Sequence, residues 1–419
     1  MKLQRFCGSL LALSIYSGVV QAGGFQLWEQ DASGIGDYHA GAAAEASGPG
    51  TEYYNPAGMV ALPSLAASIG LTYIPLDLQY DGTIRTNLLP QYARSYTNNY
   101  VPNFHLVYPF HSRLAFGFGI TTPFGLSTNY PDDIPLSAAA TKTELQTVNL
   151  NPNFAIEITK FISVGAGLDA LYGHAVYNNA LTFFHPPELL SNSLTDWGYG
   201  WDAGIMLYFT PHTRAGVSYR SKIILNGQGT STFKDLVNRE LSGNINLPDT
   251  TILGFYTDIG SRVALLFSAF YTQWSVFDNL ILQNVLLLGM PTTISVKENY
   301  QNTWNLALGL HISILSNLML KLGLGYDETP TQNGFRDLRL PDANRFAVAL
   351  GLHWQVRPSF GIDAGWIHFF PRTAVVDNSL ATADDPILIA FTTTGLVTAN
   401  VNVIGIQLTW QQSPPPIVN

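Results

Sequence analysis

The residues able to do chemistry in this chain are dispersed along it and form no recognised catalytic spacing. The nine histidines include no HExxH sequence and no pair four residues apart of the kind that binds zinc. His311 and His353 fall on the less apolar face of their strand patterns, but neither has a serine and an acid nearby at a hydrolase spacing. Gly34, Gly36 and Gly41 lack the strand–turn–helix frame of a dinucleotide site. We therefore expect no catalytic residue, no metal site and no cofactor.

Two local motifs are suited to positioning rather than to catalysis. The first comprises Asn55, Pro56, Ala57 and Gly58. Asparagine can hydrogen-bond its own backbone in a turn and proline presets φ, so this box predicts a rigid corner. The second comprises Thr122, Pro123, Phe124 and Gly125. Proline cannot donate to a strand ladder and glycine often marks a bulge, so this motif predicts either a break in a strand or its end at a loop.

The first 22 residues have the pattern of a secretory signal peptide. Lys2 and Arg5 precede an apolar run, and residues 20–22 read Val-Gln-Ala, a small-x-small cleavage site. We expect residues 1–22 to be removed, and with them Cys7, the only cysteine of the chain. The mature protein is then expected to contain no disulfide and no thiolate metal site.

The composition of the mature chain favours a membrane barrel. It has 18 basic and 29 acidic side chains, a formal charge of −11, which argues against nucleic acid as a partner. Only 12% of the residues are charged, against about 25% in ordinary soluble domains. No apolar run reaches the roughly 18 residues of a membrane helix. An exported, apolar chain without such helices predicts a transmembrane β-barrel.

Residues 64–411 alternate in the manner of barrel strands. In RLAFGFGIT, for example, Leu114, Phe116 and Phe118 share one face, with alanine and glycines opposite. Six short links separate these patterns, and seven longer polar connections are expected at 75–99, 125–143, 178–194, 226–243, 278–296, 329–341 and 371–399. Thirteen alternating connections predict an all-β membrane protein, a 14-stranded antiparallel transmembrane barrel with both termini in the periplasm.

The segment before the barrel has a different character. Residues 23–63 are rich in small residues and turns and show neither strand alternation nor a long helical stripe. A lumen of about 14 strands is too wide to be filled by its own side chains. We therefore expect residues 23–63 to form a hatch inside the barrel, followed by the barrel at 64–411 and a proline-containing tail at 412–419.

The order of several motifs resembles the FadL/TodX family of outer-membrane transporters for hydrophobic compounds. These motifs are Gly-Phe-Gln-Leu at 24–27, Asn-Pro-Ala-Gly-Met at 55–59, NPNFAIEI at 151–158, GWDAG at 200–204, LPDTTILGF at 247–255 and RLPDANRFAVALG at 339–351. No one of them is decisive, but together they cover nearly the whole mature chain.

The resemblance implies passive uptake of a hydrophobic ligand across the outer membrane of a Gram-negative bacterium. Ligand would collect at an external loop site and reach an interior pocket occupied partly by Gly23, Gly24 and Phe25. It would leave sideways through a lateral gate at residues 122–125, where the family's third strand kinks, while the corner at residues 55–58 anchors a movable hatch. We expect a monomer in contact with membrane lipid and lipopolysaccharide.

The ligand headgroup is where the chain departs from the fatty-acid members. Those members place basic pocket residues where this chain has His174 and Gln301. A carboxylate favours a cation or a charge-assisted hydrogen bond, for which His174 and Arg345 are the candidates. Long-chain fatty acids and neutral aromatic hydrocarbons therefore both stay open as substrates. A non-catalytic structural or adhesin barrel and a general porin are further alternatives, and an outer-membrane enzyme is disfavoured.

Overall fold

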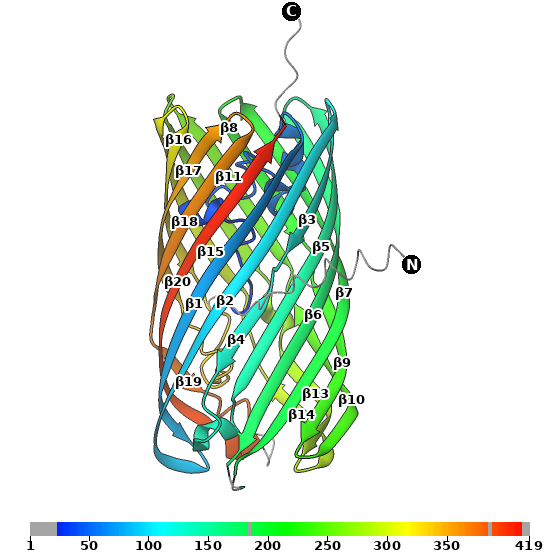
Figure 1. Ribbon diagram of the computed structural model, residues 1–419, viewed down its shortest axis with the longest axis vertical. Coiled ribbons are helices and arrows are strands. Elements are labelled where there is room, and N and C mark those ends of the chain that lie inside the picture. Colours follow the sequence, from blue (N-terminus) through cyan, green and yellow to red (C-terminus); the bar gives the residue numbers. More distant parts are fainter. Residues whose placement is uncertain (1–22, 183, 185, 384–387, 413–419) are drawn as a thin grey trace, which may run out of the picture.

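The computed structural model of the chain is a closed antiparallel β-barrel of 14 wall strands (Figure 1). The structure describes residues 23–182, 184, 186–383 and 388–412. The predicted signal peptide and residues 413–419 of the tail lie outside this part of the chain. Within the described residues, every helix is too short or too polar to cross a bilayer.

Six of the wall strands are interrupted, so the 14 strands appear as 20 extended stretches within the described residues. These are β1 (Ala66–Ile84), β2 (Asn87–His111), β3 (Leu114–Thr121), β4 (Gly125–Asn129), β5 (Lys142–Thr159), β6 (Ile162–Leu181), β7 (Glu188–Thr210), β8 (Thr213–Arg220), β9 (Ile223–Phe233), β10 (Leu236–Leu247), β11 (Thr250–Ile259), β12 (Val263–Thr272), β13 (Asn279–Leu287), β14 (Met290–Lys297), β15 (Thr303–Leu315), β16 (Leu318–Asp327), β17 (Arg345–Arg357), β18 (Phe360–Pro371), β19 (Ala374–Asp377) and β20 (Thr393–Gln411). Short helices are η1 (Gly34–Asp37), α2 (Thr51–Tyr54), η2 (Pro56–Ala61), η3 (Pro135–Ala138), η4 (Trp274–Val276) and η5 (Leu388–Phe391).

The first and last strands close the barrel. β1 pairs with β2 along nearly its whole length and with β20 on its other edge, where Ala66 faces Gln411. Both ends of the wall therefore lie at the same rim, the rim of the short turns (Figure 1). Closure leaves no free sheet edge between β1 and β20, which a lipid-facing sheet requires.

The predicted alternation is confirmed across the middle of the wall. On β6, Leu168 is 66% exposed on the outer surface, whereas the next residue, Asp169, is 2% exposed and faces the lumen. On β16, Leu324 points outward and Lys321 is buried. The alternation holds here because a large apolar side chain is stabilised on the lipid side and a polar one on the lumen side. The six short links also fall at the predicted places.

Four of the predicted long connections are instead mainly paired hairpins, including 178–194, where the β6–β7 ladder runs on to Leu181 opposite Glu188. The range 75–99 belongs to the β1–β2 ladder, which runs on to Ile84 opposite Asn87. The ranges 226–243 and 278–296 likewise belong to the β9–β10 and β13–β14 hairpins. Their pattern is inverted: on β1, Leu76 and Leu78 are buried in the lumen, while Asp77 lies on the outer face. Where the outer face of a strand meets water and the inner face meets an apolar core, the lipid-type signature is lost.

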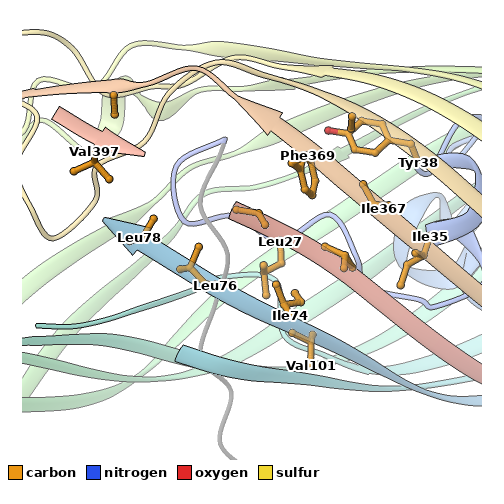
Figure 2. Packing of buried hydrophobic residues seen from close by; sticks show 14 of the residues in the cluster. Leu27, Ile35, Tyr38, Ile74, Leu76, Leu78, Val101, Ile367, Phe369 and Val397 are labelled. Carbon is orange, nitrogen blue, oxygen red and sulfur yellow. The ribbon is translucent and has the colours of Figure 1, made fainter. Parts of the chain in front are cut away.

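Residues 23–63, which we call the lumen segment, lie inside the lumen, and their apolar side chains pack against the wall. Figure 2 shows Leu27, Ile35 and Tyr38 of this segment beside Ile74 of β1 and Phe369 of β18. The same buried cluster continues along β1 and into β20. The lumen therefore contains a hydrophobic core, shared between the segment and one side of the barrel.

The contact between residues 23–63 and the wall is closest at a pair of glycines. A Cβ atom added to Gly36 of η1 would lie 2.7 Å from the Cα atom of Gly351 on β17. No real Cβ atom tolerates such a distance to a backbone atom, so η1 can approach the wall only because both residues are glycine. By contrast, a Cβ atom added to Gly48, in the same segment, would have no heavy atom within 4 Å.

We expect Gly36→Val to unseat η1 from β17, because overpacking of this kind costs about 1–3 kcal/mol. The predicted result is a higher resting conductance in planar lipid bilayers, since a displaced segment leaves more of the lumen open. Gly48→Val, which has room for the side chain, should conduct like the parent protein. Equal conductance of Gly36→Val and the parent would contradict this packing.

Candidate functional site

The barrel wall is interrupted between β3 and β4. β3 pairs with β2 on one edge and with β5 on the other, but β4 pairs with β5 alone among the described residues. The β2–β3 ladder stops at Phe104 opposite Ile120. The ladder with β5 shifts register across the interruption, from Thr121 opposite Asn149 to Gly125 opposite Gln146. We call residues 122–125, all buried, the break segment.

Pro123 explains why the ladder stops here, because it has no N–H to donate and restricts the residue before it. The strand resumes only at Gly125, and the first four residues of β4 are all buried instead of alternating. Residues 122–125 therefore form a break within a wall strand. The motif does not mark the end of that strand at an outer loop.

The first residues of the lumen segment take up the hydrogen bonds that the break leaves open. The N–H group of Leu27 donates to the carbonyl oxygen of Pro123 at 2.9 Å, and that of Gly125 donates to the carbonyl oxygen of Phe25 at 2.8 Å. Gln26 and Phe124 form an isolated antiparallel bridge. The N-terminal segment, residues 23–30, thus behaves as a short extra strand laid against the break segment.

Gln30 completes this contact through its side chain. Its Nε2 group donates to the carbonyl oxygen of Thr122 at 2.8 Å, and its Oε1 atom accepts the N–H of Thr122 at the same distance. Gln30 is fully buried. One amide side chain therefore replaces both backbone partners that Thr122 would have in a continuous sheet. No local sequence pattern indicated this role.

An aromatic cluster covers the same contact. The ring of Phe25 lies 6.2 Å from that of Phe124, 4.6 Å from that of Trp274 and 5.3 Å from that of Phe277, measured between centroids. All four rings are buried. Gly24 has φ +69°, and a Cβ there would lie 2.6 Å from the Trp274 ring, so only glycine fits. The break segment and the N-terminal segment are thus held by apolar packing as well as by hydrogen bonds.

The aromatic cluster is continuous with an apolar cavity among the long loops. Phe25, Phe124 and Trp274 belong to one buried hydrophobic cluster that extends along β6, β7, β9, β10 and β13. Six residues of this cluster also line the cavity, namely Tyr177, Leu181, Leu190, Leu280, Leu282 and Leu287. Asp337 and Arg339 provide charge at the cavity wall. An apolar molecule in the cavity would therefore touch side chains that connect without interruption to the break.

A polar group lies at the start of the N-terminal segment. Arg345 forms an ion pair with Asp327, with Nη2 and Oδ2 3.0 Å apart, and its guanidinium stacks 3.6 Å from the centre of the Phe369 ring. The N–H of Gly24 donates to Oδ2 of Asp342 at 3.3 Å. Burial raises the pKa of Asp342, which lies in the loop between β16 and β17. A Cβ atom added to Gly23 would lie 3.3 Å from Oδ1 of Asp327, the partner of Arg345, so this ion pair lies next to the start of the N-terminal segment and the charge of Arg345 is already compensated.

His174 does not join this group. On β6 the lumen side holds Leu171, Gly173 and Ala175, whereas His174 shares the outer face with Tyr172. Its Nε2 atom lies 3.1 Å from the hydroxyl oxygen of Ser193 on the neighbouring strand. The prediction that His174 meets a ligand headgroup in the interior pocket is wrong, because its side chain projects from the opposite face of the strand.

The corner at residues 55–58 is fixed to the wall at β6 and β7. The Nδ2 group of Asn55 donates to the carbonyl oxygens of Ala43, at 2.7 Å, and Ile205 of β7, at 3.1 Å. Its Oδ1 atom accepts the N–H of Ala57 at 3.1 Å. The hydroxyl of Ser163 on β6 donates to the carbonyl oxygen of Ala57 at 2.7 Å. Asn55 therefore links two parts of the lumen segment to the wall.

Buried histidine–carboxylate contacts between the lumen segment and the wall could not be found from sequence spacing. His105 on β2 contacts Glu52 at 2.7 Å, and His311 on β15 contacts Asp37 at 2.5 Å. Burial raises the pKa of the Glu52 carboxyl group. Each pair joins residues that are more than 50 positions apart, so only the folded chain brings them together.

The fold and this arrangement define a class, the transmembrane β-barrels whose lumen contains a segment of the same chain. The chain belongs to the family of outer membrane transport proteins described as OMPP1/FadL/TodX, whose model matches residues 13–411. The resemblance inferred from the sequence motifs is thereby confirmed.

Named relatives agree with this assignment. The chain is 27% identical to a long-chain fatty acid transport protein of Escherichia coli O6:H1 over 85% of this chain and 88% of that protein. It is 26% identical to outer membrane protein P1 of Haemophilus influenzae over 97% of this chain and 100% of that protein.

Solved structures show the same fold. A FadL homologue of Pseudomonas aeruginosa superposes with a TM-score of 0.82 at 21% identity, covering 93% of this chain and 100% of that one. The toluene transporter TbuX of Ralstonia pickettii superposes with a TM-score of 0.69 at 17% identity, covering 92% and 100%. At these identities the likeness concerns the fold.

We expect Gln30→Leu to loosen the break segment, because it removes both partners of the Thr122 backbone at nearly constant volume. Each unpaired buried group costs about 1–3 kcal/mol, so hydrogen exchange at residues 122–125 should accelerate by about tenfold or more. Gln26→Leu is the matched control, since the Gln26 side chain bonds Thr250 and Thr272 on the wall. Unchanged protection of residues 122–125 in Gln30→Leu would contradict the assigned contact.

Proposed function

We propose that this protein takes up hydrophobic compounds passively across the outer membrane of a Gram-negative bacterium. Ligand collects in the apolar cavity among the long loops and moves along the buried cluster to Phe25. It then leaves sideways through the lateral gate formed by Thr122, Pro123, Phe124 and Gly125. Both termini of the barrel face the periplasm, and one monomer in contact with lipid and lipopolysaccharide is sufficient.

One observation carries this proposal: the break in the wall is closed by residues 25–30, which are not part of the wall. A gap closed by a separate segment can open when that segment moves, whereas a gap closed by strand pairing requires the barrel itself to deform. The contact combines two backbone hydrogen bonds, the Gln30 bridge and packing of Phe25. Ligand that replaces Phe25 in the aromatic cluster would compensate the packing lost when the segment moves away.

Movement of Gly23, Gly24 and Phe25 requires a fixed point further along the chain. The corner at Asn55, Pro56, Ala57 and Gly58 suits this role, because it is bonded to β6 and β7. We propose that the corner keeps the lumen segment attached to the wall while residues 23–30 swing.

Two substrate classes fit the site. Long-chain fatty acids are suggested by the relatives from Escherichia coli, and the candidate cations are Arg345, near residues 23–25, and Arg339, at the cavity wall. Neutral aromatic hydrocarbons are suggested by the toluene transporter, and the pairing of Arg345 with Asp327 favours them, because the Arg345 guanidinium already has a carboxylate partner. A structural or adhesin barrel is less favoured, because such a protein would not need a continuous apolar cluster from the cavity among the long loops to the break segment.

Replacing Pro123-Phe124-Gly125 by Val-Thr-Val should seal the wall, because it restores strand alternation and a backbone donor. We expect uptake of radiolabelled oleate and of toluene to fall to the level of cells without the protein. Pro371→Val, at the end of β18, is the matched control and should leave uptake unchanged. Normal uptake by a correctly folded triple variant, judged by heat-modifiable gel mobility, would overturn the lateral exit.

A second variant separates the two substrate classes. Arg345→Gln combined with Asp327→Asn removes both charges with little change of volume. If Arg345 receives a carboxylate, oleate uptake should fall by about tenfold or more, since a charge-assisted hydrogen bond contributes about 1.5–3 kcal/mol. Toluene uptake in the same cells is the internal control and should not change. Equal oleate uptake by variant and parent would exclude Arg345 as the headgroup partner.

A further inference from the structure

A second cluster of chemically capable side chains lies away from the break, where η1 meets β15. It consists of Asp37, Glu45 and His311, each of which offers a ligand atom within 4.8 Å of the others. We propose that this cluster binds a divalent transition-metal ion that fastens the lumen segment to the barrel wall. The ligand spacing is invisible in the sequence, because His311 is more than 260 positions from the two carboxylates.

The two ring nitrogens of His311 face different carboxylates: Nε2 makes a direct hydrogen bond of 2.5 Å with Oδ2 of Asp37, and Nδ1 lies 4.0 Å from Oε1 of Glu45. One ion would take one of these nitrogens, and the Asp37–His311 hydrogen bond would give way to two bonds to the ion. Asp37 and His311 are buried, and Glu45 is half-buried. One imidazole and two carboxylates suit zinc and similar first-row ions, which accept mixed nitrogen and oxygen ligands.

Two buried atoms at this place have no partner among the described residues. Oδ1 of Asp37 accepts no hydrogen bond, although the residue is fully buried. Nε2 of His39 is likewise unpartnered, while Nδ1 of the same ring lies 3.0 Å from the Tyr54 hydroxyl. His39, Asp37 and Glu45 line one small polar cavity. Unpaired buried polar atoms are rare, and a bound ion with its water ligands would satisfy both of these.

The charges around the cavity leave a deficit of positive charge. The carboxylates are Asp31, Asp37, Glu45 and Asp363. The cations are Lys321, whose Nζ lies 3.4 Å from Asp363, and Arg214, which bonds the carbonyl oxygens of Ala44 and Glu45. With neutral histidines the surplus is two negative charges, which one divalent ion balances. Protonation of His311 and His353 would balance it equally, so the experiment must separate an ion from two protons.

The position of the cluster gives the ion a structural role. Asp37 ends η1 and Glu45 follows it in the lumen segment, whereas His311 belongs to the wall strand β15. A metal bound by all three would cross-link the two parts. This role does not depend on the proposed lateral exit, and either can fail without the other.

Zinc binding to the purified full-length protein tests the proposal. After treatment with a chelator and its removal, titration with ZnCl₂ followed by calorimetry should show one saturable site, and zinc should raise the unfolding temperature. Asp37→Asn and His311→Gln should each weaken binding by at least about tenfold, the scale seen even when only a hydrogen-bond partner of a metal ligand is replaced. His212→Gln is the matched control, because it removes an exposed His–Asp pair that has no third ligand.

The outcomes are decisive in both directions. The absence of a saturable site in the parent protein, or equal zinc affinity in the parent, Asp37→Asn and His311→Gln, would overturn the proposal and favour a protonated His311. If either buried variant fails to fold, Glu45→Gln decides, since Glu45 lies at the rim of the cavity. Weaker binding in Glu45→Gln supports the site, and unchanged binding rejects it.

Discussion

The hydrogen bonds between residues 25–30 and residues 122–125 are the constraint on which the closed form of this barrel depends. A lipid-exposed sheet cannot leave backbone N–H and C=O groups unpaired, because each costs several kcal/mol in hydrocarbon. β4 nevertheless pairs with β5 alone among the described residues. Backbone and side-chain groups of residues 25–30, inside the lumen, supply the hydrogen-bond partners of residues 122–125. The N-terminal segment therefore covers the break in the wall without belonging to a wall strand.

The lumen has a polar region near the short turns and an apolar region near the long loops. Near the short-turn rim, buried histidine–carboxylate contacts such as His105–Glu52 and His311–Asp37 hold residues 31–63 against the strands. Toward the long loops the inner faces become apolar, and the cluster around Phe25 runs from the break to the outer cavity.

Much of the fold could be predicted from the sequence, because the patterns that indicate it involve residues close together in the chain. Alternation and short turns are properties of neighbouring residues, which is why the 14 strands and the irregularity at Pro123 were found. The partner of that irregularity was not, because the pairing of Gln30 with Thr122 joins residues 92 positions apart. His174 was misplaced because adjacent residues of a strand face opposite sides of the sheet, and a family resemblance does not by itself fix which residue of β6 faces the lumen. The hairpins at 75–99 and 226–243 were missed because their alternation is inverted outside the lipid.

The pairing of Gln26 with Phe124 allows the closure of the wall to be tested directly. Residues facing each other across an antiparallel bridge have Cα atoms about 4.5–5.5 Å apart, which is within the range of a disulfide. Cys7, the only cysteine of the chain, lies in the predicted signal peptide, so in a protein cleaved after Ala22 the combination of Gln26→Cys and Phe124→Cys would supply the only two thiols. If movement of residues 23–30 opens the wall, uptake by the double variant stops on oxidation and returns on reduction, while each single variant is insensitive to both. Equal uptake by the oxidised and reduced double variant would contradict this closure.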